Sequence, residues 1–285
     1  MKIFNFAAKK SDSLYEQAIP IALTVAVFGA LAVALLFVVR LLNLLPTGSP
    51  ISENLRWGDI VVGATIYFKT SVDFAILIGY LMRNNPGWKN RIAIELGTAL
   101  GNGAGTILIL SFWVVFKQLH FLLALMILLS ALVLFEMAES GVQHFDSWRY
   151  HIGLKHNLYK ILKGILDFIL KFTKPVTSRI LPNFSKTLSG NRKLKWTALM
   201  VFALTTPFIL GLDDFAGYVP LFSVVNVFGF AVGVIGAHMI LNIGLFANPD
   251  ATIKFFKNQW ISFIGAVAFL GLAFWGLIEA VRILV

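Results

Sequence analysis

The stretch TSVDFAILIGYL, residues 70 to 81, is almost entirely apolar, yet it carries Asp73 in its interior. A second apolar stretch, LGLDDFAGYVPLF at 210 to 222, contains two neighbouring carboxylates, Asp213 and Asp214. The whole chain is 58% hydrophobic and 13% charged with a mean hydropathy of +0.81, whereas soluble domains carry roughly 25% charged residues. These values predict an integral membrane protein, in which both acidic stretches lie inside the bilayer.

Apolar runs of about 20 residues are long enough to cross a bilayer as helices. The first run is too long for the apolar core of a signal peptide and lacks a small-residue cleavage site, so we interpret it as a retained helix. The absence of cysteine excludes disulfides and thiolate chemistry. The fold class is therefore predicted to be all-α with seven transmembrane helices, near residues 18–45, 59–82, 92–116, 120–140, 196–220, 222–247 and 258–283.

The distribution of lysine and arginine predicts the orientation. With the N-terminus inside, nineteen of the 24 basic residues lie in cytoplasmic segments and only four at the outer ends of spans, in agreement with the positive-inside rule. This predicts a multi-pass protein of the cytoplasmic (inner) membrane with its N-terminus inside and its C-terminus outside. The net charge of +10 is thereby explained as a topology signal, and nucleic-acid binding is not expected.

The basic linker at 141–195 contains NLYKILKGILDFILKFTKPV, residues 157 to 176. Apolar residues recur there at helical spacing with lysines on the other face, a pattern typical of a helix lying on the membrane surface. Its lysines would attract anionic lipid headgroups. The alternative is a solvated tether that joins two halves of the protein.

Internal repetition predicts those two halves. The tripeptide DFA occurs at 73–75 and at 214–216, an offset of 141, so Asp213 and Asp214 both remain candidate counterparts of Asp73. Each unit holds three spans, an odd number, so the copies cross in opposite directions as in many secondary transporters. The predicted parts are an N-terminal tail with the first helix (1–58), repeat 1 (59–140), the linker (141–195) and repeat 2 (196–285). An offset of 140 pairs Asp73 with Asp213, Asn102 with Asn242, Lys117 with Lys257 and Glu139 with Glu279.

Asp73 is predicted to lie near the bilayer centre. Placing an Asp there costs roughly 2.5–3.5 kcal/mol on insertion scales, so its side chain must face the bundle interior and find a proton, a cation or a hydrogen-bond donor. Lys69, one turn earlier, is an alternative partner, and an Asp that merely fixes helix packing is the simpler interpretation. Two carboxylates related by inverted symmetry favour a cation site.

The polar residues nearby suit a cation. Asn102 and Asn242 offer amide oxygens and Thr98 a hydroxyl, which are ligands for hard or borderline divalent ions such as Ca²⁺ or Mn²⁺. His238, one helical turn from Asn242, would add a nitrogen ligand, although a lone membrane histidine more often serves packing. We therefore predict a metal site of Asp73, Asp213, Asp214, Asn102 and Asn242, with Lys69, Thr98, His238, Glu139 and Glu279 as secondary candidates.

Other residues have simpler interpretations. Glu139 and Glu279 lie near span ends and are expected to be interfacial or paired, with gating or proton coupling as the alternative. Glu95 is expected to pair with Arg91 at i−4 rather than to assist cation entry. The glycines of ELGTALGNGAGT (95–106) and those at 229, 233 and 236 are expected to let helix backbones approach closely.

The two acidic stretches together resemble the signatures of the lysine-exporter superfamily of membrane transporters, and are most similar to its cadmium-resistance and TerC-type branches. The resemblance covers residues 65–105 and 205–245. It implies two inverted three-helix repeats, a central acidic site and export of a metal cation. The single Asp after Val72 and the long basic linker depart from the pattern and leave the substrate open.

These observations predict a secondary transporter rather than an enzyme. Its substrate would be a divalent cation, with Mn²⁺, Ca²⁺ or Cd²⁺ as candidates, moved outward by alternating access with no cofactor. No nucleotide-binding motif is present in the sequence. An exporter of amino acids or other small solutes is the alternative, and an intramembrane lipid-modifying enzyme is disfavoured because its carboxylates would have to lie nearer the headgroups.

Overall fold

The structure is a computed structural model that describes residues 14–46, 50–143, 154–180, 194–210, 218–223, 225–256 and 258–285. Every regular element in this part of the chain is helical. Five helices are long and apolar enough to cross a membrane. They are α1 (Leu14–Asn43), α4 (Trp88–Phe116), α5 (His120–Gln143), α9 (Val227–Ala247) and α11 (Gln259–Leu284). The chain is therefore a multi-pass helical membrane protein, as its composition predicted.

The five long helices confirm the predicted spans near 18–45, 92–116, 120–140, 222–247 and 258–283, with one adjustment. α9 begins at Val227 rather than at 222, because a 3₁₀ helix, η3 (Val219–Ser223), precedes it. The Asn226 side chain caps α9 by accepting a hydrogen bond from the backbone N–H of Gly229 at 3.1 Å. Asparagine is a preferred residue at this position because its oxygen satisfies an otherwise unpaired helix N–H group.

The predicted span at 59–82 is not one continuous helix. It consists of α2 (Trp57–Thr70) and α3 (Val72–Asn84), which meet at Ser71 with a bend of 65°. At the break, the Tyr67 carbonyl accepts from the Ser71 backbone N–H at 2.9 Å and also from the Thr70 hydroxyl at 3.1 Å. α3 then runs against the short helix α10 (Pro249–Phe256). Counted as one broken span, α2 and α3 bring the candidate spans to six among the described residues.

One further helix lies inside the linker and another follows the linker directly. α6 (Leu154–Ile180) forms where the amphipathic helix was predicted, and it packs against α5. α7 (Trp196–Leu210) follows it and is a shorter apolar helix, since the described part of the predicted span at 196–220 stops at Leu210 and resumes at Tyr218.

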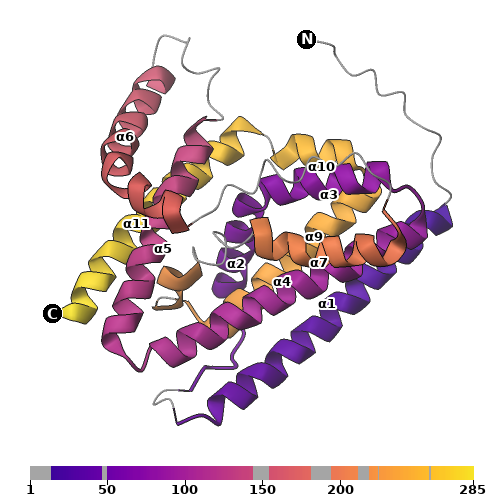
Figure 1. Ribbon diagram of the computed structural model, residues 1–285, viewed down its shortest axis with the longest axis horizontal. Helices are drawn as coiled ribbons and strands as arrows, with labels where there is room; N and C mark the ends of the chain where they lie inside the picture. Colours follow the sequence, from indigo (N-terminus) through magenta and orange to yellow (C-terminus); the bar gives the residue numbers. More distant parts are fainter. Residues whose placement is uncertain are drawn as a thin grey trace.

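The most extensive helix pairs are α5 with α11, α4 with α7, and α2 with α9, while α1 lies along α4 and α9 (Figure 1). Glycines bring two of these pairs together. A Cβ at Gly63 or Gly233 would collide with the partner helix backbone at Phe230 or Ile60, and one at Gly97 or Gly101 would collide with Met200 or Leu204. The expected role in close packing is confirmed for Gly97, Gly101 and Gly233, since small residues let membrane helices approach without a side-chain barrier.

α9 lies at the centre of the bundle and contacts α1, α2, α3, α4 and α10. Its apolar side chains, such as Val234, Leu241 and Leu245, are fully buried. Its polar residues His238 and Asn242 lie on the enclosed side of the helix, 2% and 0% exposed.

Candidate functional site

A polar cluster lies in this interior, between α2, α4 and α9. It comprises Tyr67 from α2, Glu95 and Thr98 from α4, and His238 and Asn242 from α9. Glu95 is 1% exposed and Asn242 is 0% exposed. Polar groups buried in apolar surroundings are costly unless they are hydrogen bonded, so this cluster has to satisfy itself internally or through a ligand.

Asn242 is the centre of the cluster. Its Nδ2 atom lies 2.6 Å from Glu95 Oε2, 3.1 Å from His238 Nε2 and 3.3 Å from Thr98 Oγ1. Three lone-pair atoms from two helices thus converge on one point, which the electropositive NH₂ group occupies. The amide offers only two hydrogens for three acceptors. The opposite amide orientation would place its oxygen against the Glu95 carboxylate, which explains why the nitrogen faces this point.

The neighbouring contacts fix the orientation of His238. Since Nε2 accepts from Asn242, its ring proton belongs on Nδ1, which lies 2.6 Å from the Tyr67 hydroxyl oxygen. The rings of Tyr67 and Phe74 lie on either side, with centroids 5.8 Å and 5.7 Å from that of the imidazole. Helices α2 and α3 therefore hold the ring so that its Nε2 lone pair points to the centre of the cluster.

Two buried polar atoms next to the cluster have no hydrogen-bond partner among the described residues. They are the carbonyl oxygen of Asn242 and the amide nitrogen of Asn102, which is 3% exposed on α4. Asn102 follows Thr98 by one helical turn, so both side chains lie on the same face of α4. Buried polar groups are nearly always paired in folded proteins, and unpaired ones point to an unrecorded water, ion or ligand.

The predicted site residues fall into two sets. Asn242, Thr98 and His238 come together, with Asn102 one turn away. Asp73 belongs to α3, next to Phe74, but its side chain is outside the described part of the structure. Asp213 and Asp214 also lie outside the described residues. The expected meeting of the three carboxylates therefore stays a prediction.

The remaining candidates lie elsewhere. Lys69 lines an apolar cavity of about 660 Å³ between α2, α9, α10 and α11, and its side chain lies over Gly265. Glu279 pairs with Arg282 on its own helix at 3.6 Å, as expected for a residue near a span end. Glu139 is half-buried on α5.

Glu95 has a different partner in the structure from the one that the sequence suggested. Its i−4 spacing suggested a pair with Arg91, whereas its carboxyl group is hydrogen bonded to Asn242, 147 positions away. The described residues contain no group of three or more His, Asp and Glu side chains that could hold a metal ion. In this cluster Glu95 supplies a carboxyl group and His238 an imidazole. Asn242 adds an amide and Thr98 a hydroxyl.

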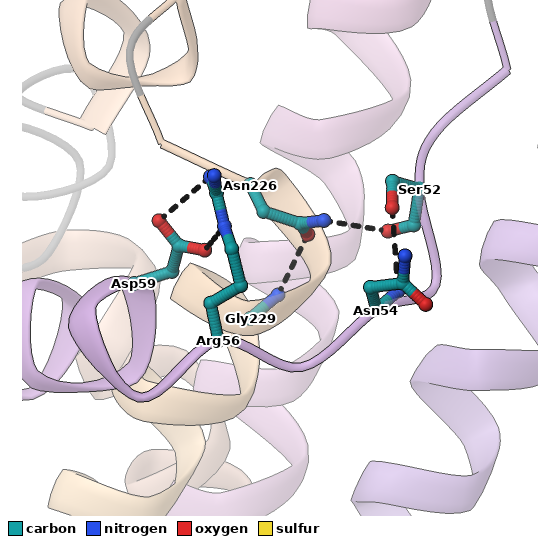
Figure 2. Close-up of polar contacts among 6 residues, drawn as sticks. All are labelled: Ser52, Asn54, Arg56, Asp59, Asn226 and Gly229. Atoms are coloured by element: carbon teal, nitrogen blue, oxygen red, sulfur yellow. Dashed lines mark hydrogen bonds and ion pairs between the residues drawn. The ribbon is translucent and has the colours of Figure 1, made fainter.

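A second polar cluster lies at the N-terminal ends of α2 and α9, as Figure 2 shows. Arg56 forms an ion pair with the buried Asp59 at 2.7 Å, and Asn226 donates to the Ser52 carbonyl at 3.0 Å. A comparable contact joins the segments that precede α4 and α7, where the Asn85 side-chain oxygen accepts from the backbone N–H of Leu194 at 3.1 Å. The Asn226–Ser52 contact thus joins the segments before α9 and α2, and the Asn85–Leu194 contact joins the segments before α4 and α7.

The Asn226–Ser52 and Asn85–Leu194 contacts lie at opposite ends of the bundle. α1 runs parallel to α4, because Thr24 lies beside Glu95 and Leu31 beside Gly103. The C-terminal end of α1 is joined to Ile51 through Asn43, so the segment holding Ser52 is at the far end from the start of α4.

Composition and helices define the chain as a multi-pass helical membrane protein with a buried polar cluster. Searches of protein-family models, curated proteins and solved structures find no match to it.

Proposed function

We propose that the protein is a secondary transporter that moves a divalent metal cation across the cytoplasmic membrane, outward, by alternating access. The observation that carries the proposal is the convergence of Glu95, Thr98 and His238 on one point inside the bundle. A carboxylate and other lone-pair donors directed at a common point in a membrane interior constitute an environment for a positive guest. Intramembrane ionisable residues commonly mark ion pathways for this reason.

The helix pairing supports two inverted repeats. Exchanging the halves, so that α2 corresponds to α7, α4 to α9 and α5 to α11, converts the α2–α9 pair into α7–α4 and leaves the α5–α11 pair unchanged. These are the three most extensive helix pairs. In the proposed arrangement the polar cluster lies between α4 and α9, the equivalent helices of the two halves, which is where inverted-repeat transporters hold their substrates.

The antiparallel course of α5 and α11 agrees with the same exchange. Gly141 of α5 lies near Ala266 of α11, and Ala131 lies near Gly276, so residue numbers rise in one helix as they fall in the other. A two-fold axis in the membrane plane requires equivalent helices to run in opposite directions. The boundaries of the repeats at 59–140 and 196–285, and the N-in, C-out orientation, are part of the proposal.

The acidic stretches and the linker are also part of the transport proposal. Asp73 and either Asp213 or Asp214 are proposed to contribute further cation ligands, in keeping with the resemblance of their stretches to the lysine-exporter superfamily. The lysine-bearing face of α6 is proposed to contact anionic lipid headgroups. Export of amino acids or other small solutes remains the competing function.

Transport by the full chain in liposomes tests the proposal. Wild-type protein is expected to move Mn²⁺, Ca²⁺ or Cd²⁺ down an imposed gradient, and Asp73→Asn, Asp214→Asn and Glu95→Gln variants are expected to lose most of that flux. The matched control is Ser130→Ala on α5, whose buried hydroxyl bonds only to the Met126 carbonyl of its own helix at 2.8 Å in the described structure. Flux of amino acids with none of any cation would favour the competing function and overturn this one.

A further inference from the structure

We propose that His238 determines the specificity of this site, and that its cargo is a divalent transition-metal ion that accepts nitrogen ligands rather than Ca²⁺ or Mg²⁺. The inference rests on the proposed transport function and concerns which ion the site selects. It is drawn from the atoms that surround Asn242, independently of the acidic stretches.

An ion bound in this cluster would occupy the position of the Asn242 NH₂ group. Asn242 Nδ2 lies within 3.3 Å of a carboxylate oxygen, an imidazole nitrogen and a hydroxyl oxygen. The NH₂ group carries partial positive charge and therefore stands where a cation would be stabilised. Metal–ligand bonds of about 2.0–2.2 Å are shorter than these contacts. Side-chain rotations that move the ligand atoms by about 1 Å would bring them to bonding distance of an ion.

The side-chain oxygen of Asn242 is available as a further ligand. Its carbonyl group has no hydrogen-bond partner among the described residues. For an ion to take the place of the NH₂ group, the Asn242 side chain has to rotate about both its Cα–Cβ and Cβ–Cγ bonds. That movement withdraws the nitrogen from the convergence point and turns the carbonyl oxygen toward the ion as a fourth ligand. Asn242 thus holds the ligand set together without cargo and joins it when cargo arrives.

The types of donor atom select the kind of metal. Ca²⁺ takes six to eight oxygen ligands and Mg²⁺ prefers oxygen and water, whereas imidazole suits transition metals. The described residues offer three oxygen donors and one imidazole, and a ligand set that includes an imidazole favours a transition metal over Ca²⁺ or Mg²⁺ also when the proposed aspartate ligands join it. The chain lacks cysteine, so no thiolate is present to favour soft ions.

The Tyr67 hydroxyl supports the histidine ring. Metal-binding histidines usually donate their second ring N–H to a neighbouring oxygen, which fixes the tautomer and aims the other nitrogen. His238 has this arrangement, because Tyr67 lies 2.6 Å from Nδ1 and Asn242 occupies the side of Nε2.

Calorimetry on the full chain in nanodiscs, with Mn²⁺, Co²⁺, Zn²⁺, Ca²⁺ and Mg²⁺ as the chloride salts, tests the inference. Wild-type protein is expected to bind the transition metals at least tenfold more tightly than Ca²⁺ or Mg²⁺. His238→Gln is expected to remove that preference. Tyr67→Phe keeps the ring packing and removes only the hydroxyl, and it is expected to weaken transition-metal binding about 10–100-fold. Ser130→Ala is expected to bind as wild type does.

A spectroscopic readout separates the two proposals. Pulsed electron paramagnetic resonance of the Mn²⁺-loaded protein is expected to show coupling to a ¹⁴N nucleus, which His238→Gln abolishes. Wild-type protein that binds metal without a nitrogen coupling, or variants of His238 and Tyr67 that bind with unchanged affinity, would overturn this inference and leave the transport proposal standing. Wild-type protein that binds no divalent cation would overturn both.

Discussion

Asn226 and Asn85, 141 positions apart, occupy corresponding places at opposite ends of the bundle. Asn226 precedes α9 and donates to the Ser52 carbonyl, in the segment before α2. Asn85 precedes α4 and accepts from the Leu194 N–H, in the segment before α7. Each asparagine therefore joins the second helix of one proposed half to the segment leading into the first helix of the other. The offset equals that of the DFA tripeptides, which supports the inverted repeat from residues that the sequence comparison did not use.

These two contacts should oppose each other in an alternating-access cycle. Replacing one asparagine by alanine removes a hydrogen bond worth about 1 kcal/mol, enough to shift a two-state equilibrium about fivefold. Asn226→Ala is expected to open the site toward the end where α2 and α9 begin, and Asn85→Ala toward the other end. The chain lacks native cysteine, so a single Thr98→Cys substitution reports access by labelling with an impermeant thiol reagent from each face.

The helix cap requires a separate control, because Asn226 also accepts from the Gly229 N–H. Asn226→Ser retains a capping oxygen but is too short to reach Ser52, so it should reproduce the labelling change while losing less stability than Asn226→Ala. Equal labelling from both faces in all of these variants would show that the two contacts do not control access.

The glycine contacts lead to a prediction about stability. Gly101→Ala and Gly63→Ala place a methyl group against the partner backbone at Leu204 and Phe230, and overpacking of this kind costs about 1–3 kcal/mol. Gly271→Ala on α11 is the matched control, since a Cβ there meets nothing within 4 Å. The thermal unfolding midpoint in detergent should fall for the first two variants and stay level or rise for the third. A similar fall in all three would mean that helix separation is not set by these glycines.

The sequence was sufficient to locate five long spans, because a run of about 20 apolar residues has few alternatives to a membrane helix. It did not reveal the break at Ser71. Hydropathy measures the polarity of a segment and carries no information about direction, so a helix that bends by 65° inside an apolar run looks continuous. The adjacent hydroxyls of Thr70 and Ser71 were the available signal, since such side chains compete for backbone acceptors.

The site was predictable only in part, because spacing within one helix does not show which other helix it meets. His238 and Asn242 were selected because they are polar residues one turn apart on an apolar helix, a feature local to the sequence. Glu95 was assigned to Arg91 because the i−4 rule considers one helix alone. Its partner lies 147 positions away and depends on how α4 crosses α9, which spacing within one helix does not encode.

Helix α6 provides a prediction about the membrane surface. Tyr159, Leu166 and Leu170 are buried, whereas Ile161, Ile165 and Phe168 form an exposed apolar stripe at helical spacing, with Phe168 68% exposed. This stripe is expected to enter the lipid interface while the lysines remain among the headgroups. A bimane probe at Phe168→Cys should shift to the blue in anionic bilayers, and the same probe at the exposed Asp167→Cys should not.

The contribution of the lysines to this contact is tested in the same system. Lys160→Gln with Lys171→Gln should weaken the dependence on anionic lipid, because each lysine near such a surface contributes about 1 kcal/mol. Identical emission at positions 168 and 167 would place α6 away from the bilayer and favour the tether interpretation.

Glu95 provides the strictest test of the polar cluster, because stability and cation binding should respond differently to its replacement. Glu95→Ala removes the shortest hydrogen bond of the Asn242 amide, and a hydrogen bond to a charged group is worth about 1.5–3 kcal/mol, so the unfolding midpoint should fall clearly. Glu95→Gln keeps the shape and an acceptor oxygen, so it should unfold close to wild type yet lose the negative charge that a cation requires. Calorimetry and unfolding measured on the same nanodisc samples would separate the two effects. A Glu95→Gln protein that unfolds and binds metal as wild type does would show that this carboxylate only fixes helix packing.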